Sequence, residues 1–320
     1  MADPKKFDKQ LSVVIPVYNE EESLPALSAR IYPVLDALGM DYELVFVDDG
    51  SGDRSVAFLR EQFQRRPDVT RVVLLQSNFG QHAAILAGFA HARGQWVVTL
   101  DADLQNPPEE IPRLLEKMGE GYDYVGTIRR KRQDSWWRMA ASRLMNRIRE
   151  RITRVRMTDQ GCMLRAYSHT ITDAINSTAE VTTFIPALAY LYASKPTEIS
   201  VEHEERAHGK SKYSLYKLLR LNFDLVTSFS VVPLELFSFF GLILASLSAM
   251  LVIYLAIQRI FFGPQVQGIF TLFGIVFFLI GVILFGIGLL GEYIGRIYRQ
   301  VQQRPRYLIS AVLERNDPAT

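Results

Sequence analysis

The stretch QWVVTLDADLQ, residues 95–105, decides the fold of this chain. It begins as a short apolar run of the kind found in strands buried on both faces, and it ends in two carboxylates. Three similar runs come earlier, at LSVVIPVY (11–18), YELVFVDDGS (42–51) and TRVVLLQS (70–77), with helical patterns over 21–38, 55–64 and 81–93. Strands that alternate with helices predict an α/β domain with an open, mostly parallel sheet covered by helices on both faces.

Polar residues follow the carboxyl ends of three of these strands. They are Tyr18, Asn19 and Glu20 after the first strand, Asp48 and Asp49 after the second, and Asp101 and Asp103 after the fourth. Ligands of open α/β sheets bind just outside the carboxyl ends of the strands. The sequence therefore predicts a ligand site along this edge.

The pair Asp101 and Asp103 predicts a divalent cation site. Carboxylate oxygens are hard ligands that suit Mg²⁺ or Mn²⁺, with positions left for diphosphate oxygens, and Gln105 adds an amide oxygen or a water-mediated contact. Such an ion neutralises the charge that grows on a departing nucleoside diphosphate. The alternative is a strand-end turn in which the aspartates accept from backbone amides.

The segment Asp48-Asp49-Gly50-Ser51 predicts a second binding element. A carboxylate at this edge can accept from a base N–H or from ribose hydroxyls, as in other doubly wound folds. The alternative is a helix N-cap followed by a turn.

Two uncharged runs predict a membrane hairpin. Leu236–Ile257 has 22 residues, and the second run extends over 260–291 with Gly263-Pro264 as the break. A helix needs about 20 apolar residues to cross a bilayer. Cations flank the pair at Lys210, Lys212, Lys217, Arg220, Arg296, Arg299, Arg304 and Arg306, whereas the connection holds only Arg259. This bias places both flanks in the cytoplasm. A buried hairpin of soluble core helices is the alternative.

Two segments outside the hairpin predict helices that lie in the membrane interface. Residues 136–157 combine an apolar stripe at helical spacing with a dense arginine face and two tryptophans, and residues 213–226 lead into the first span. A core-packed helix with a solvated basic face is the alternative for residues 136–157. We therefore expect a cytoplasmic catalytic domain over 1–230, a transmembrane hairpin over 231–293 and a cytoplasmic tail over 294–320.

Composition limits the remaining functions. The net charge of +2 does not favour nucleic acid, the single Cys162 excludes intrachain disulfides, and the opening residues lack the apolar core of a cleaved signal peptide. The five histidines have no metal-ligand spacing. Residues 304–312 predict a short strand, and because an unpaired strand edge invites pairing with another subunit, we expect a homo-oligomer, with a tetramer as one possibility.

The motifs of this chain resemble those of a known family. VVIPVYNEEESLPAL, VFVDDGSGDRS, NFGQHAAILAGF and LDADLQNPPEEIP are similar to family 2 glycosyltransferases of the polyprenyl-phosphate type. GTIRRKRQDSWWR, GCMLRAY, HGKSKYS and LLGEYIGRIYRQVQQRPRY extend the resemblance over roughly residues 11–308. It implies a GT-A (Rossmann-like) domain with two C-terminal transmembrane helices, a UDP-sugar donor, an undecaprenyl phosphate acceptor, Mg²⁺ or Mn²⁺, and a bacterial inner membrane location.

The resemblance leaves two sugars open. It implies inverting transfer of 4-deoxy-4-formamido-L-arabinose, which serves lipid A modification and resistance to polymyxin and other cationic peptides, and the alternative sugar is glucose.

The resemblance also assigns roles to residues. Pro16, Tyr18, Glu20 and Asp49 would hold the nucleoside, while Asp101, Asp103 and Gln105 would bind the metal and diphosphate. Arg206, Lys210, Ser211 and Lys212 would belong to a loop that closes over the diphosphate. Arg129, Arg138 and Ser142 would meet the acceptor phosphate, and Asp159 would orient or activate the acceptor. A guanidinium fork suits phosphate oxygens, because it supplies both charge and direction.

Three other function classes fit the sequence less well. A transporter would need polar residues inside the spans, but Glu235 and Glu292 lie at their ends. A nucleotide sensor without turnover would not need metal carboxylates and phosphate-directed arginines together. A processive polysaccharide synthase would carry a Gln-x-x-Arg-Trp motif, which this sequence lacks.

Overall fold

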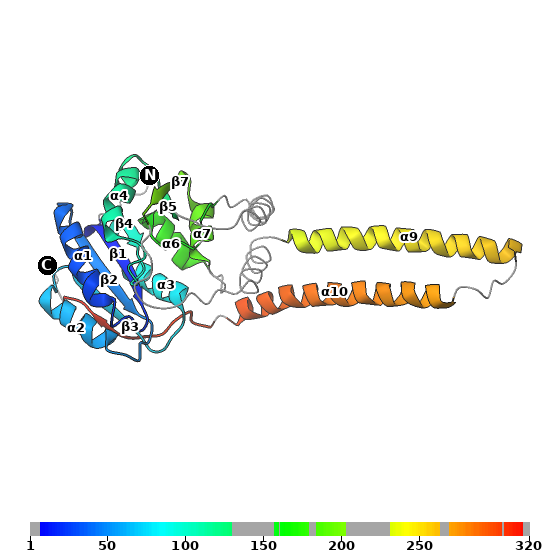
Figure 1. Ribbon diagram of the computed structural model, residues 1–320, viewed down its shortest axis with the longest axis horizontal. Coiled ribbons are helices and arrows are strands. Elements are labelled where there is room, and N and C mark those ends of the chain that lie inside the picture. Colours follow the sequence, from blue (N-terminus) through cyan, green and yellow to red (C-terminus); the bar gives the residue numbers. More distant parts are fainter. Residues whose placement is uncertain are drawn as a thin grey trace. The chain divides into compact units, whose positions relative to one another are not determined.

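One mixed sheet dominates the computed structural model, which describes residues 7–129, 157–159, 161–178, 184–202, 231–262, 269–302 and 304–315. Within these residues the strand order is β7-β5-β6-β4-β1-β2-β3-β8 (Figure 1). The strands are β1 (Lys9–Val17), β2 (Tyr42–Asp48), β3 (Thr70–Leu75), β4 (Gly94–Thr99), β5 (Tyr124–Arg129), β6 (Arg165–Ser168), β7 (Pro196–Val201) and β8 (Ile309–Leu313). Only β6 and β8 run antiparallel to their neighbours.

Helices follow the strands in the order that the sequence pattern predicts. They are α1 (Leu24–Ala37), α2 (Ser55–Arg65), α3 (Gln81–His91), η1 (Pro108–Glu110), α4 (Ile111–Gly119), α6 (His169–Ser177) and α7 (Ile185–Tyr192). The four expected strands and three expected helices of the first hundred residues are confirmed. The strand β4 ends at Thr99, so the carboxylate pair lies in the turn that follows and not on the strand.

The central strands are apolar because helices cover them. Every residue of β2 and β3 is buried, which explains why their sequences do not alternate between polar and apolar residues. On α3, Gly88 allows a close approach to the sheet, since a Cβ there would lie 2.2 Å from Val14 and 3.2 Å from Val47. The sheet is therefore a rigid platform for the loops at its carboxyl edge.

The register aligns the strand ends that carry the predicted site. Val17 of β1 pairs with Asp48 of β2, and Val14 of β1 pairs with Thr99 of β4. The backbone continues this pattern for one step, because the Asp49 amide donates to Val17 (2.8 Å) and the Leu100 amide donates to Val14 (3.1 Å). The loops after β1, β2 and β4 thus leave the sheet side by side.

The C-terminal strand corrects one expectation. We expected residues 304–312 to present an unpaired strand, but β8 pairs antiparallel with β3 of the same chain. Leu308 accepts from the Gln76 amide (2.8 Å), and the Ser310 hydroxyl donates to Leu74 (3.1 Å). The strand β8 accordingly belongs to the same compact unit as the rest of the sheet.

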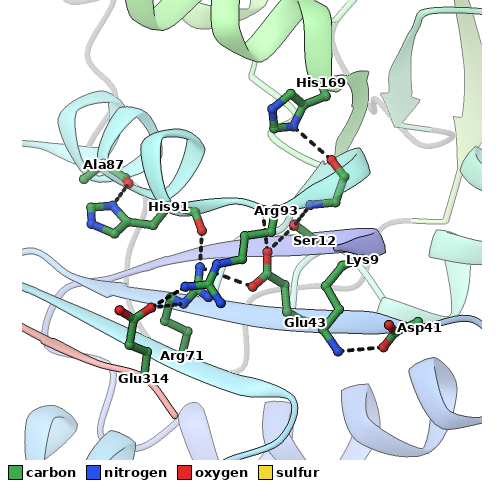
Figure 2. A network of polar contacts seen from close by, with 11 residues as sticks. Lys9, Ser12, Asp41, Glu43, Arg71, Ala87, His91, Arg93, His169 and Glu314 are labelled. Atoms are coloured by element: carbon green, nitrogen blue, oxygen red, sulfur yellow. Dashed lines mark hydrogen bonds and ion pairs between the residues drawn. The ribbon is translucent and has the colours of Figure 1, made fainter. Parts of the chain in front are cut away.

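An ion network fixes the end of β8 at the amino ends of the parallel strands (Figure 2). Glu314 contacts Arg93 (2.7 Å) and Arg71 (3.3 Å), and Arg71 also contacts Glu43 (3.3 Å). Glu43 in turn accepts from the Ser12 hydroxyl (2.5 Å) and from the Arg93 amide (2.6 Å). Because burial lowers the pKa of Arg71, its guanidinium depends on these two carboxylates. Glu314 of the tail therefore helps Glu43 to neutralise the buried charge of Arg71.

The second compact unit contains two long helices, α9 (Val232–Phe262) and α10 (Ile269–Val301). They contact each other where Phe237 lies on Gly286, since a Cβ on that glycine would fall 2.3 Å from the phenyl ring. Among the described residues, one segment is long and apolar enough to cross a membrane, Ile275–Tyr298, with a mean hydropathy of 2.5. Val232–Leu244 is apolar but shorter. The second span thus stays a prediction.

Both interfacial helices that the sequence predicts lie almost entirely outside the described residues. Of residues 136–157 only Met157 is described, and of residues 213–226 none is.

Candidate active site

Hydrogen bonds join the loops after β1 and β2 into one surface. The Asn19 amide donates to the Ser51 hydroxyl (3.0 Å), and the Asn19 side chain accepts from the Gly52 amide (2.8 Å). The Glu20 amide donates to the Ser55 hydroxyl (2.9 Å). Asn19 has a positive φ of 53°, which a short polar side chain tolerates. Tyr18, 49% exposed beside this turn, is available to stack on a ligand ring.

The two aspartates after β2 differ in their partners. Asp49 is buried, and its two oxygens accept from the amides of Phe79 (2.7 Å) and Gly80 (2.8 Å) just before α3. Burial raises the pKa of Asp49, while the two amide hydrogen bonds oppose that shift. One oxygen of Asp48 accepts from the amides of Gly50 and Ser51, and its other oxygen is buried with no partner in the described structure. Asp49 therefore anchors the start of α3, a role that the sequence analysis did not foresee.

The carboxylate pair after β4 lies in a tight turn. Asp103 accepts from the Gln105 amide (3.2 Å) and from the Gln105 side chain (2.5 Å), and Leu104 between them has a positive φ of 60°. Asp101 accepts from the side chain of Gln81 (2.6 Å), the first residue of α3. The same short segment, 79–81, thus joins Asp49 of one loop to Asp101 of the next.

The donor set in this turn fits a divalent cation. Among the described residues, no three His, Cys, Asp or Glu side chains gather at one point. Two half-buried carboxylates and an amide oxygen are nevertheless the hard ligands that Mg²⁺ and Mn²⁺ accept, because these ions keep positions for water and phosphate oxygens. Asp101, Asp103 and the Gln105 oxygen would hold the ion.

Asp159 and Arg129 form a two-point ion pair. Nε of Arg129 donates to Oδ2 of Asp159 (2.7 Å), and Nη2 donates to Oδ1 (2.9 Å). Gly161 also donates its amide to Oδ1 (3.0 Å), and a Cβ at Gly161 would lie 2.8 Å from Nη2 of Arg129. The Asp159 carboxylate raises the pKa of Arg129, and the charge of Asp101 adds to that effect. Arg129 therefore lies within electrostatic range of Asp101.

The ion pair bears on the two roles implied for Asp159. The residue is 3% exposed, and both oxygens already accept strong hydrogen bonds from a guanidinium. A carboxylate so stabilised is a weak proton acceptor, because its charged form is favoured. The geometry supports an orienting role and not a general base.

Three residues of the site were missed by the sequence analysis. Gln81 reaches Asp101, and Asn106 accepts from the Cys162 thiol (3.2 Å), which joins the metal turn to the segment that carries Asp159. Arg165 lies behind Asp159 and is fully buried. An arginine in the otherwise apolar run CMLRAY was the available signal, since a charge in such a run needs specific partners.

Other predicted site residues are placed only in part. Pro16 lies in β1, next to the loop of Tyr18 and Glu20. Arg138, Ser142, Arg206, Lys210, Ser211 and Lys212 lie outside the described residues. The roles expected of all these residues stay predictions.

Comparisons with known proteins show the family of this chain. A family model described as glycosyl transferase family 2 matches residues 12–175. An undecaprenyl-phosphate 4-deoxy-4-formamido-L-arabinose transferase of Edwardsiella ictaluri (strain 93-146) is 52% identical over 310 residues, 96% of this chain and 95% of the relative. A transferase of the same name from Enterobacter sp. (strain 638) is 51% identical over 313 residues, 97% of this chain and 96% of the relative.

The solved structures that match this chain are more distant in sequence. Glucosyl-3-phosphoglycerate synthase from Mycobacterium tuberculosis, in complex with Mn²⁺, UDP and glucosyl-3-phosphoglycerate, has a TM-score of 0.46 and 20% identity, covering 69% of this chain and 78% of that one. S. aureus TarS 1-349 in complex with UDP-GlcNAc has a TM-score of 0.46 and 17% identity, covering 68% and 66%. On the family match and the near full-length relatives, this chain belongs to glycosyl transferase family 2.

Proposed function

We propose that this protein transfers 4-deoxy-4-formamido-L-arabinose from its UDP-sugar to undecaprenyl phosphate, with inversion at the anomeric carbon. The observation that carries this proposal is the 52% identity, over 95% of its length, to a relative that bears this activity in its name. The product would serve lipid A modification and resistance to polymyxin and other cationic peptides.

The donor half of the site lies at the carboxyl ends of β1, β2 and β4. Tyr18 offers a ring for the base, and the unpartnered buried oxygen of Asp48 is an acceptor for a base N–H. Asp101, Asp103 and Gln105 would hold Mg²⁺ or Mn²⁺, which when bound neutralises charge on the leaving diphosphate. The backbone and side-chain hydrogen bonds around 79–81 keep these loops in fixed positions before the donor arrives.

The acceptor half is built on Arg129. Asp159 occupies Nε and Nη2 of its guanidinium, and Nη1 donates to no atom in the described part of the chain. The Nη1 group would bind the acceptor phosphate together with Arg138 and Ser142, for which the family resemblance implies the same role. A phosphate monoester already carries negative charge near neutral pH, so the acceptor needs correct orientation and neutralisation of its charge more than it needs a general base. Attack from the face opposite UDP would invert the sugar.

The membrane arrangement and the assembly are also part of the proposal. The apolar segment Ile275–Tyr298 and the shorter Val232–Leu244 support a two-span hairpin in the bacterial inner membrane. The distribution of lysine and arginine supports a cytoplasmic catalytic domain, close to the lipid phosphate. The outer edge of β8, the last strand of the described sheet, supports a homo-oligomer.

One assay tests the function directly. Purified full-length protein is incubated with undecaprenyl phosphate, Mg²⁺ or Mn²⁺ and either UDP-4-deoxy-4-formamido-L-arabinose or UDP-glucose, and the lipid product is identified by mass spectrometry. We expect the formamido-arabinose product, with Asp103→Ala as the inactive control. Transfer of glucose alone would replace the proposed sugar, and no transfer to the lipid from either donor would reject the function.

A further inference from the structure

Arg165 is a buried cation whose hydrogen-bond partners are neutral groups. Its side chain, in β6, has no exposed surface, and its hydrogen bonds go to the carbonyls of Cys162 (2.8 Å, from Nε) and Asp159 (2.7 Å, from Nη2) and to the Tyr124 hydroxyl. In the described part of the chain, no carboxylate lies within ion-pair distance of Arg165. A desolvated guanidinium with neutral partners is costly for a fold, so its presence calls for a specific reason.

The two carbonyls belong to a segment that forms no strand of its own, although Thr99 of β4 and Thr127 of β5 donate to the carbonyls of Met163 and Leu164 in it. Residues 157–159 and 161–164 have no regular secondary structure, although they end directly at β6. Side chains fix this segment instead: Thr158 donates to Glu198 (2.6 Å), Cys162 donates to Asn106 (3.2 Å), and Arg165 spans the carbonyls at each end of the turn. Of these three side chains, Arg165 is the one that donates to the backbone carbonyl of Asp159.

From Asp159 the contacts continue to the front of the site. Its carbonyl accepts from Arg165, while its carboxylate accepts from two nitrogens of Arg129, whose side chain is 23% exposed. A shift of the Asp159 backbone therefore moves the carboxylate that fixes the direction of the Arg129 fork. The buried arginine, the aspartate and the half-buried arginine form one chain of contacts from the core to the surface of the site.

We propose that Arg165 is a positioning residue for the acceptor phosphate, which acts through Asp159 to fix the orientation of Arg129. The inference rests on the proposed function, because it takes Arg129 as the group that meets the acceptor. A guanidinium suits this task because one planar group donates to two carbonyls along fixed directions. A lysine keeps the charge but donates from a single point, and a methionine fills the space without donating.

Steady-state kinetics of the full-length enzyme tests the proposal. In Arg165→Lys we expect the KM for undecaprenyl phosphate to rise at least about tenfold, and in Arg165→Met to rise further, because each charge-assisted hydrogen bond contributes that order of discrimination. The KM for the UDP-sugar and the dissociation constant of UDP, measured by calorimetry, should stay within about twofold of wild type. The effect on the acceptor KM distinguishes positioning from loss of folded protein, which lowers kcat alone.

Two further variants keep the test decisive. Arg71→Lys changes another buried arginine of the same sheet, in β3 on the other side of the central strands, and should lower the unfolding temperature without separating the two KM values. Gly161→Ala leaves Arg165 intact but places a Cβ 2.8 Å from Nη2 of Arg129, and it should reproduce the rise in acceptor KM even where the Arg165 variants do not fold. A wild-type enzyme that transfers no sugar to the lipid rejects the proposed function. An active wild type whose Arg165 and Gly161 variants shift both KM values equally, or neither, overturns the positioning role.

Discussion

Asp49→Asn separates an anchoring role from a nucleoside-binding role. Both oxygens of Asp49 accept from backbone amides, at 2.7 Å and 2.8 Å, and the residue is 3% exposed. Asparagine keeps one acceptor oxygen, so its NH₂ group must face the amide of Phe79 or Gly80. The variant loses one charge-assisted hydrogen bond and leaves a buried amide unpaired, which together cost about 2–4 kcal/mol.

That cost is large enough to measure. For a domain of this size about 1 kcal/mol corresponds to roughly 2–4 °C, so we expect the unfolding temperature to fall by about 5–15 °C. Intrinsic tryptophan fluorescence of the full-length protein in detergent follows the transition, with Trp96 of β4 inside the sheet. The matched control is Asp41→Asn, which removes an exposed ion pair with Lys9 and should change stability by less than about 1 kcal/mol.

The two roles predict different results. If Asp49 anchors residues 79–81, Asp49→Asn lowers stability also in the absence of ligand, and saturating UDP restores only part of it. An unchanged unfolding temperature combined with a large rise in the KM for the UDP-sugar would refute the anchoring role, and it would support the nucleoside contact that the family resemblance implies.

Three further predictions concern the metal turn, the tail and pH. Asp103→Ala should lower the rate of sugar transfer at least about 100-fold with little change in unfolding temperature, and removal of divalent cations with EDTA should lower the rate equally. Activity that survives both treatments would exclude a catalytic cation at Asp101 and Asp103. Glu314→Gln should lower the unfolding temperature by a few degrees (about 1 kcal/mol or more), because Arg71 loses one of its two carboxylates. The control Glu61→Gln removes an exposed ion pair within one helix and should leave the unfolding temperature unchanged. Equal effects of the two variants would mean that the tail network does not stabilise the sheet. Burial lowers the pKa of His82 from 6.5 to about 4, so neutral His82 contributes up to about 3 kcal/mol to stability above pH 6.5, and this contribution is lost as the pH falls toward 4. Between pH 7.5 and 4.5 the unfolding temperature should therefore fall less steeply in His82→Phe than in the wild type. Identical slopes would contradict this assignment.

The local sequence pattern was enough to predict the strands and helices of the first hundred residues. Runs such as VFVDD and VVTLDAD encode buried strands through their own side chains, and a parallel sheet brings strand ends to one edge by its geometry alone. The position of the turn that carries Asp101 and Asp103, and of the loops after β1 and β2, therefore followed from sequence. The family resemblance added chemical roles for Arg129 and Asp159, but it left open whether Asp159 accepts a proton.

Only the tertiary structure decided contacts between distant segments. Asp49 pairs with amides 30 residues away, Arg129 pairs with Asp159 across a similar separation, and Ser310 of the tail strand reaches Leu74 across 236 residues. No local pattern encodes these partners, because a carboxylate or an edge strand is satisfied equally well by many donors. Sequence thus determined which edge of the sheet carries the candidate site. Folding decided which charges there neutralise one another and which remain for the substrate, since long-range packing alone brings them within hydrogen-bonding distance.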